Sequence, residues 1–314
     1  MNNLLVLTFA DKQLSGINYL KKSCDHFGIS LEVLICTPWV QNVVKLKMLY
    51  EFVSAADDPE LVLLVVDAYD VVIYDAAKQL LQQFNEEDTD VLFSGESNFM
   101  YKEPAKWLSF LRKYPKQPTI YQYLNSGTYM GKVKDLKLLL EDMQVRFDLD
   151  LLDEEKLLPI KSDQYLLSRY FVESQRSGKL ETKLDAYHHL LGVTGGRFCV
   201  IRLPDITKWQ SFSHFIIERN LLKLLSLHQH QKIPKDYHPH QGKFRNRATR
   251  TIPLVMHFPG TWDRFDKVYE DLLDGKPPSK SGTWIFAALV SLASYPLSIL
   301  AAPIFWLITR KWGK

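Results

Sequence analysis

The sequence predicts an α/β domain built around a mostly parallel β-sheet. Short β-rich runs alternate with helical patterns through the first two-thirds of the 314 residues, as expected for strands connected by covering helices. The continuous apolar run from Leu61 to Val66 has the length of one strand and is typical of a central strand buried on both faces. The composition, with 46% hydrophobic and 24% charged residues, is that of a globular protein that buries a core.

Strand and helix patterns follow one another in order along the chain. Strands are expected over residues 4–8, 31–36, 61–66 and 91–94, where aliphatic residues cluster in short runs. Helices are expected over residues 17–26, 43–54 and 76–84, where apolar residues recur with helical spacing. This alternation places most strands parallel, because each helix carries the chain back across the sheet.

The charge balance and the cysteine content indicate which partners the protein binds and in which cellular compartment it lies. The 39 basic and 36 acidic residues give a net charge of +3, which argues against nucleic acid as a partner. Cys24, Cys36 and Cys199 are an odd number without metal-type spacing, so we expect reduced thiols. The N-terminus lacks the basic region of a signal peptide, and its apolar run is too short for one. We therefore expect the main domain to face the cytosol.

An uncharged hydrophobic segment lies near the C-terminus. No residue from Thr283 to Thr309 is charged, and about 20 apolar residues are enough to span a bilayer as a helix. Trp284 and Trp306 suit positions at the membrane interface. Pro296 and Pro303 leave two membrane arrangements open, a kinked spanning helix or a hairpin that enters and returns. A buried helix of the core is the third alternative.

These features divide the chain into three predicted parts. A domain covers residues 1–272, and a Pro-, Gly- and Ser-rich linker follows over residues 273–283. A membrane segment covers residues 284–309, so we expect the protein to be membrane-associated through it.

Two carboxylates, Asp67 and Asp70, directly follow the expected central strand in the sequence Val-Asp-Ala-Tyr-Asp-Val. In open α/β sheets ligands bind outside the carboxyl ends of the strands, which is where these acids are expected. Paired carboxylates suit Mg²⁺ or Mn²⁺, which takes further ligands from diphosphate oxygens. The alternative is that Asp67 caps the next turn and Asp70 is merely solvated.

Further motifs follow in order along the chain. They are Thr8-Phe9 at the end of the first strand, Lys45 in a helix, Leu92–Ser97, Leu124–Gly131, Asp163-Gln164, Leu184-Asp185 and Pro253–Gly260. Together with the acidic motif at residues 67–71 they resemble the glycosyltransferase domain of the lysyl hydroxylase (procollagen-lysine dioxygenase) family and, more loosely, the collagen galactosyltransferases. The resemblance covers about residues 1–265.

The resemblance implies a GT-A glycosyltransferase fold, in which a Rossmann-like sheet is joined to an acceptor-binding half. It implies transfer of a hexose from a UDP-sugar to a hydroxyl of a glycan, glycoprotein or glycolipid, with Mn²⁺ or Mg²⁺ as cofactor. By position it assigns Asp67, Asp70 and His257 as metal ligands. It places the nucleotide sugar near Thr8, Phe9, Lys45, Asp67, Tyr69, Asn125, Gly127 and Gly260.

Local sequence supports some of these roles. An apolar run over residues 252–256 predicts a strand that leads to His257, and Mn²⁺ accepts an imidazole beside carboxylates. Residues 125–127, Asn-Ser-Gly, predict a loop of small residues that the sugar can approach closely, with a plain turn as the alternative.

Three further residues are candidates for catalysis. Asp163 and Gln164 are expected beside the hydroxyls of the donor sugar, although Asp163 could instead be the N-cap of a helix. Asp163 or Asp185 is the candidate base if transfer inverts the sugar, whereas a retaining transfer needs no dedicated base.

Parts of the sequence depart from the family pattern, and other residues favour rival functions. Pro-Ile-Lys-Ser replaces a longer acidic run before Asp163, and residues 98–104 also differ, which argues against a collagen-type acceptor. The rival functions are an inactive sugar-nucleotide-binding module and a metal-dependent nucleotidyltransferase or phosphohydrolase. A rival zinc site would use four histidines of a Lys- and Gln-rich stretch, His228, His230, His238 and His240.

We predict that the hydrophobic segment determines membrane association and is dispensable for folding. A chain that ends near Asp274 should be soluble and folded, because a Pro-, Gly- and Ser-rich linker separates the segment from the main domain. Membrane flotation and circular dichroism of the full and shortened chains measure both properties. Aggregation of the shortened chain, together with a full chain that is soluble without detergent, would assign the segment to the core.

Overall fold

A computed structural model describes residues 3–12, 15–97, 110, 113–160, 162–175, 179–194, 237–260, 265–266 and 269–270. All of them belong to one compact unit formed by residues 1–196 and 234–275. Within this described part, no helix is both long and apolar enough to cross a membrane. The predicted boundaries at 272 and 283, the hydrophobic segment and the divergent residues 98–104 lie outside the described residues.

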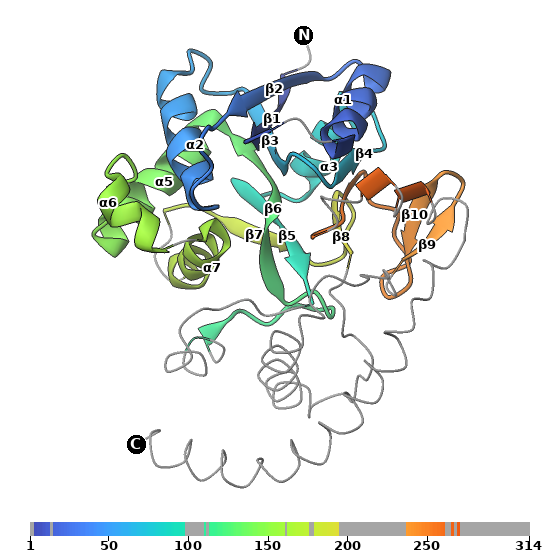
Figure 1. The fold of residues 1–314 in the computed structure, drawn as a ribbon. Helices are drawn as coiled ribbons and strands as arrows, with labels where there is room; N and C mark the ends of the chain where they lie inside the picture. The colour runs from blue at the N-terminus through green and yellow to red at the C-terminus, as the bar shows by residue number, and fades with distance from the viewer. Residues whose placement is uncertain are drawn as a thin grey trace, which may run out of the picture. The chain divides into compact units, whose positions relative to one another are not determined.

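A six-stranded sheet forms the centre of the described structure (Figure 1). Its strand order is β2-β1-β3-β6-β5-β7. The strands are β1 (Leu4–Ala10), β2 (Ser30–Ile35), β3 (Val62–Asp67), β5 (Val91–Glu96), β6 (Tyr123–Lys132) and β7 (Thr182–Asp185). Only β6 runs against its neighbours, and the pairs β1–β2, β1–β3 and β5–β7 are parallel. The predicted α/β class with a mostly parallel sheet is therefore confirmed.

The helices alternate with these strands. They are α1 (Ser15–Phe27), α2 (Val44–Ala55), α3 (Ala77–Glu86), α5 (Val133–Phe147), the short α6 (Glu154–Leu157), the 3-10 helix η1 (Leu158–Ile160) and α7 (Asp163–Ser174). The sequence-based limits of the four strands and three helices predicted within residues 4–94 are confirmed to within about two residues, the usual uncertainty of element ends.

The sheet is covered on both faces. Val62, Leu64 and Val66 of β3 pack in one core cluster with residues of α1 and α3. Leu63 and Val65 are equally buried and point to the opposite face, because successive side chains of a strand alternate. On that side α2, α5 and α7 lie together (Figure 1). Burial on both faces explains why β3 is a continuous apolar run.

A second, three-stranded sheet has the order β4-β11-β8. It consists of β4 (Val71–Ile73), β8 (Leu191–Val193) and β11 (Val255–His257). The predicted strand over residues 252–256 is only partly correct, because β11 begins three residues later and includes His257. A separate antiparallel hairpin joins β9 (Tyr237–His240) to β10 (Lys243–Asn246).

Strand β6 contains the Asn125–Gly127 segment that was predicted as a loop, and this prediction is wrong. Asn125 pairs with Ser94 of β5, whereas Tyr129 pairs with Phe93, so the register shifts between these pairs. The β6 residues between Asn125 and Tyr129 are therefore extra relative to β5, as in a β-bulge. Small residues fit this irregular strand as well as they fit a loop, which explains the error.

A buried histidine connects the hairpin to the sheet. His188 is fully buried, and its Nε2 lies 2.7 Å from the Gly95 carbonyl oxygen of β5. Its Nδ1 contacts the Tyr237 hydroxyl and lies 3.1 Å from Asn246 Nδ2. Burial lowers the pKa of His188 to about 4, and this outweighs the opposing effect of Asp185.

We predict that His188 makes the protein less stable in mild acid. Its pKa is lower in the folded than in the unfolded chain, so its contribution is complete above about pH 6.5 and is lost as the pH falls toward about 4. Between about pH 7.5 and about pH 5 the loss should reach about 2 kcal/mol. Urea unfolding at both pH values measures it. His188→Gln should remove this part of the pH dependence, and an unchanged dependence in that variant would contradict the assignment.

Candidate functional site

The turn between β3 and β4 brings two carboxylates together. Asp67 is the last residue of β3, and Asp70 directly precedes β4, which begins at Val71. Only Ala68 and Tyr69 separate them, so both carboxylates lie at the carboxyl end of the central strand. The side chain of Asp70 is 6% exposed and that of Asp67 is 34% exposed. Solvent therefore reaches the Asp67 carboxylate, whereas the Asp70 carboxylate is buried.

Strand β11 brings His257 to the same place. Its antiparallel pairing with β4 sets His257 opposite Val71. The Phe258 N–H donates to the Asp70 carbonyl, and the Gly260 N–H donates to Asp70 Oδ2 over 3.0 Å. The backbone pairing thus fixes where the imidazole lies relative to the carboxylates.

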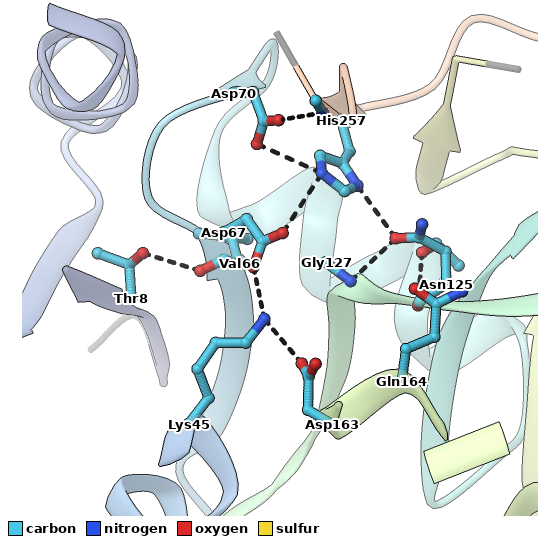
Figure 2. A network of polar contacts seen from close by, with 12 residues as sticks. Thr8, Lys45, Val66, Asp67, Asp70, Asn125, Gly127, Asp163, Gln164 and His257 are labelled. Carbon is cyan, nitrogen blue, oxygen red and sulfur yellow. Dashed lines mark hydrogen bonds and ion pairs between the residues drawn. The ribbon is translucent and has the colours of Figure 1, made fainter. Parts of the chain in front are cut away.

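Asp67, Asp70 and His257 form a group of candidate metal ligands (Figure 2). One ligand atom from each residue lies within 4.8 Å of the other two. His257 Nε2 is 3.3 Å from Asp70 Oδ1 and 3.5 Å from Asp67 Oδ2. This nitrogen is buried and, in the described structure, has no hydrogen-bond partner. A divalent cation would satisfy it, since imidazole and carboxylates are ligands that Mn²⁺ accepts.

Each carboxylate uses its other oxygen within the protein. Asp67 Oδ1 accepts from the Lys45 ammonium over 2.8 Å, while Asp70 Oδ2 accepts from the Gly260 N–H. Two oxygens and one nitrogen therefore face a common point. Such a set leaves room for further ligands from a substrate, as is usual for Mg²⁺ and Mn²⁺ sites that bind phosphates.

Lys45 of α2 connects this group to α7. Its Nζ lies 2.7 Å from Asp163 Oδ2 and 2.8 Å from Asp67 Oδ1. Burial alone lowers the pKa of the Lys45 ammonium, but the carboxylates of Asp163 and Asp67 outweigh burial and hold this pKa above its ordinary value. Lys45 is therefore a permanent positive charge at the edge of the site.

Asp163 is not the N-cap of α7, so that alternative is wrong. Ser162 is the cap, and its hydroxyl accepts from the Tyr165 N–H over 3.3 Å. Asp163 is the first residue of the helix and is buried against Lys45. Gln164, the next residue, donates to Glu96 Oε1 over 2.6 Å and to the Leu124 carbonyl over 3.0 Å.

Asn125 and Gly127 contact His257 directly. Asn125 Oδ1 lies 3.0 Å from His257 Nδ1 and accepts from the Gly127 N–H over 2.9 Å. A Cβ at residue 127 would lie 2.1 Å from His257 Cε1, so only glycine allows the ring to pack against β6. These residues, which were predicted to contact the sugar, therefore surround the imidazole (Figure 2).

Other predicted donor-binding residues lie near the ends of β1 and β3. Thr8 and Phe9 are buried in β1, and the Thr8 hydroxyl donates to the Val66 carbonyl over 2.8 Å. The Tyr69 hydroxyl accepts from the Asp11 and Lys12 N–H groups over 3.0 and 3.1 Å. Burial raises the pKa of Tyr69, and the Asp11 carboxylate beside its hydroxyl adds to this rise.

Asp185 stabilises its own turn. Its carboxylate accepts from the backbone N–H groups of His189, Leu190 and Leu191 over 2.7 to 3.0 Å. Three such bonds hold the start of β8 beside the end of β7. The structure therefore gives Asp185 a structural task, and no contact places it in the described ligand group.

Two residues near the site were missed as site residues. Glu96 was quoted only as part of a motif, yet it is buried and accepts from Asn125 Nδ2 over 3.3 Å as well as from Gln164. Asp11 was not singled out, although it bonds Tyr69. A buried acid at the end of a strand was the available signal for Glu96.

The rival zinc site has no support in the described residues. Of its four histidines, His238 and His240 lie on β9, and His228 and His230 fall outside the described structure. Across the described ranges, the group of three or more metal-ligating side chains is the one formed by Asp67, Asp70 and His257.

Comparison with known proteins relates the chain to one family. Residues 1–198 match the PLOD GT domain, a match that includes Asp67 and Asp70 but ends before His257. Procollagen-lysine,2-oxoglutarate 5-dioxygenase 1 of Gallus gallus is 29% identical over 195 residues, which are 58% of this chain. The human multifunctional procollagen lysine hydroxylase and glycosyltransferase LH3 is 26% identical over 192 residues, again 58% of this chain.

The matched region covers 24% of the length of each of these two relatives. The likeness therefore concerns one domain of larger proteins. Within this domain the mixed α/β architecture is consistent with a GT-A-like fold. Because the family match covers more than half of the chain, the chain belongs to the family of the PLOD GT domain, the glycosyltransferase domain of the lysyl hydroxylases.

Proposed function

We propose that this glycosyltransferase domain transfers a hexose from a UDP-sugar to a hydroxyl acceptor and depends on Mn²⁺ or Mg²⁺. The observation that carries the proposal is the convergence of Asp67, Asp70 and His257 around a buried nitrogen that has no hydrogen-bond partner among the described residues. Family membership supports sugar transfer over the rival nucleotidyltransferase or phosphohydrolase. The hexose, the uridine nucleotide and the choice of metal are parts of the proposal.

The ligand set fits a divalent cation in charge as well as in geometry. Asp70 is almost fully buried, and a buried carboxylate is costly unless a cation or hydrogen bonds compensate it. His257 supplies no positive charge when it is neutral, and Lys45 lies on the far oxygen of Asp67. A bound Mn²⁺ or Mg²⁺ would supply charge neutralisation for the leaving diphosphate.

The residues themselves bind and orient the substrates. Asp67 Oδ2, Asp70 Oδ1 and His257 Nε2 would hold the cation beside the carboxyl end of β3. Lys45 keeps Asp67 in place and adds a fixed positive charge toward the diphosphate. We propose that Thr8, Phe9 and Tyr69 lie beside the nucleotide of the donor.

We infer that neither Asp163 nor Asp185 acts as a general base. Asp163 is buried, and its carboxylate is engaged in an ion pair with the Lys45 ammonium at 2.7 Å. Both carboxylate oxygens of Asp185 accept backbone N–H bonds of its own turn, so neither oxygen is presented to a substrate. This supports a transfer that relies on positioning and charge neutralisation, as expected if the sugar configuration is retained.

The acceptor and the membrane association are further proposals. We propose a glycan, glycoprotein or glycolipid acceptor other than the collagen type, because the sequence departs from the family pattern at residues 98–104 and before Asp163. We also propose that residues 284–309 hold the chain at a membrane with the domain in the cytosol, on the strength of their uncharged apolar sequence.

Replacing any of the three ligands should weaken Mn²⁺-dependent UDP binding by about a hundredfold or more, since loss of even an outer-shell partner costs about ten- to a hundredfold. Asp67→Asn and Asp70→Asn keep an acceptor for Lys45 and for the Gly260 N–H, so folding should change little. His257→Ala removes the third candidate ligand. Calorimetric UDP titrations with and without Mn²⁺ measure the effect.

Asp75→Asn is the matched control, because Asp75 also pairs with a lysine, Lys243, but lies outside the ligand group. It should bind UDP and Mn²⁺ like the parent protein. Normal binding by His257→Ala would leave only the two acids as ligands. Normal binding by both aspartate variants as well would remove the support for the metal-dependent reaction.

We predict that Gly127→Ala displaces the His257 ring and abolishes stabilisation by Mn²⁺. The added Cβ overlaps the imidazole, and overpacking of this kind costs about 1–3 kcal/mol. Thermal unfolding with and without Mn²⁺ and UDP separates the two effects, because a cation that binds only the folded state raises the melting temperature.

Gly131→Ala in the same strand is the control for this variant. A Cβ there would contact the Asp90 carbonyl at 3.1 Å, a tight contact remote from the ligand group. It should lower stability slightly and keep the shift produced by Mn²⁺. An equal shift in Gly127→Ala would show that the ring position is not needed for binding.

A further inference from the structure

We propose that Asn125 sets the tautomer of His257, so that Nε2 presents its lone pair to the cation, and that Glu96 fixes the Asn125 amide in the orientation this requires. The inference rests on the proposed function, because it takes His257 as a metal ligand. It gives Asn125 and Glu96 the role of positioning residues. Asn125 was predicted to contact the donor sugar, and the described hydrogen bonds of its side chain are with Gly127, His257 and Glu96.

The tautomer follows from the one contact whose donor is unambiguous. A backbone N–H can only donate, and the Gly127 N–H lies 2.9 Å from one atom of the Asn125 amide. That atom must therefore be the oxygen, Oδ1. The same oxygen lies 3.0 Å from His257 Nδ1. Two acceptors cannot form a hydrogen bond, so Nδ1 carries the hydrogen.

A neutral imidazole carries one N–H, so with Nδ1 protonated the lone pair lies on Nε2. Nε2 is the atom that faces Asp67 and Asp70. Metal-bound histidines commonly donate their other ring N–H to an oxygen in this way, which fixes ring orientation and tautomer. The imidazole is thus arranged for a cation before any cation binds.

The opposite end of the Asn125 amide is fixed by Glu96. Asn125 Nδ2 lies 3.3 Å from Glu96 Oε1, and Gln164 Nε2 donates to the same oxygen over 2.6 Å. An ionised carboxylate only accepts. A flipped Asn125 amide would set its oxygen against Glu96 and its NH₂ group against the Gly127 N–H. Both hydrogen bonds would be replaced by repulsive contacts.

Burial makes one orientation of the Asn125 amide strongly favoured over the flipped one. Glu96, Asn125 and His257 are 7%, 4% and 2% exposed, so water does not readily replace the lost partners. A buried polar group left without its partner costs about 1–3 kcal/mol. The favourable hydrogen-bond direction therefore runs from His257 to Asn125 and from Asn125 to Glu96, with each residue donating to the next.

The experiment observes the tautomer directly in the full chain. Two-bond ¹H–¹⁵N correlation spectra of protein labelled with ¹⁵N-histidine distinguish a protonated Nδ1 from a protonated Nε2. The spectra are recorded without metal, at a pH where titration shows the imidazole to be neutral. The His257 signals are identified by their loss in His257→Gln. Mn²⁺ affinity is measured separately, by electron paramagnetic resonance with saturating UDP.

Two variants test the contacts. Asn125→Ala removes the acceptor, so the Nδ1-protonated form should lose its predominance, and Mn²⁺ affinity should fall about ten- to a hundredfold. Glu96→Gln is the conservative variant. Its side-chain oxygen can still accept from the Asn125 and Gln164 amides, which both donate to Glu96 Oε1, so tautomer and affinity should both remain parental.

Asn246→Ala is the matched control. Asn246 is also buried, and its amide lies 3.1 Å from the Nδ1 of a different histidine, His188. Its loss should leave the His257 signals and the Mn²⁺ affinity unchanged, whatever its effect on the melting temperature. Should Asn125→Ala fail to fold, the tautomer of the parent protein and that of Glu96→Gln still test the inference.

Protonation of Nε2 in the parent protein would overturn the inference, and so would parental Mn²⁺ affinity and tautomer in Asn125→Ala. A Glu96→Gln variant that folds but loses the Nδ1-protonated form would also overturn it. These outcomes leave the proposed function standing if the parent binds Mn²⁺ with UDP. A parent that binds no Mn²⁺ contradicts the proposed function instead, and the metal-free spectra tell the two failures apart.

Discussion

The pairing of β11 with β4 is the constraint on which the site depends. Backbone hydrogen bonds set His257 opposite Val71, so the strand pairing itself brings the imidazole to Asp70. Two neighbouring carboxylates such as Asp67 and Asp70 repel each other, and among the described residues only Asp67 has a lysine in ion-pair contact. The small sheet therefore holds together carboxylates that repel each other. This is preorganisation, with its cost included in the folding free energy of the domain.

Much of the fold and part of the site could be predicted from the sequence because their determinants are local. The apolar run of β3 and the acids that follow it are neighbours in the chain, so strand, turn and carboxylates are recognised together. Helical spacing likewise identified α1, α2 and α3 to within about two residues. His257 was assigned through its apolar run and the family resemblance, and the pairing of β11 places it beside Asp70.

The remainder depends on contacts between distant segments. Asn125 and Gly127 have the composition of a turn, and only pairing with β3 and β5 makes them part of a strand. Glu96 is near the site only because the side-chain amides of Asn125 on β6 and Gln164 on α7 donate to it. Asp163 was considered as a helix cap because aspartate is a favoured N-cap residue, but Ser162, an equally good cap, stands one residue earlier. The partner of Asp163, Lys45, lies on another helix. No local pattern distinguishes these cases.

The separation of β11 from β4 along the chain has a consequence for biosynthesis. Gly260, which donates to Asp70, lies 190 residues further along the polypeptide. At roughly 5–20 residues per second, a ribosome needs roughly 10–40 s to make that interval. A nascent chain therefore exposes Asp67 and Asp70 without their histidine for that period, with Lys45 as the nearby cation. The group of candidate ligands is incomplete until β11 has been made, and an interrupted chain that ends before β11 has the acids but not the imidazole.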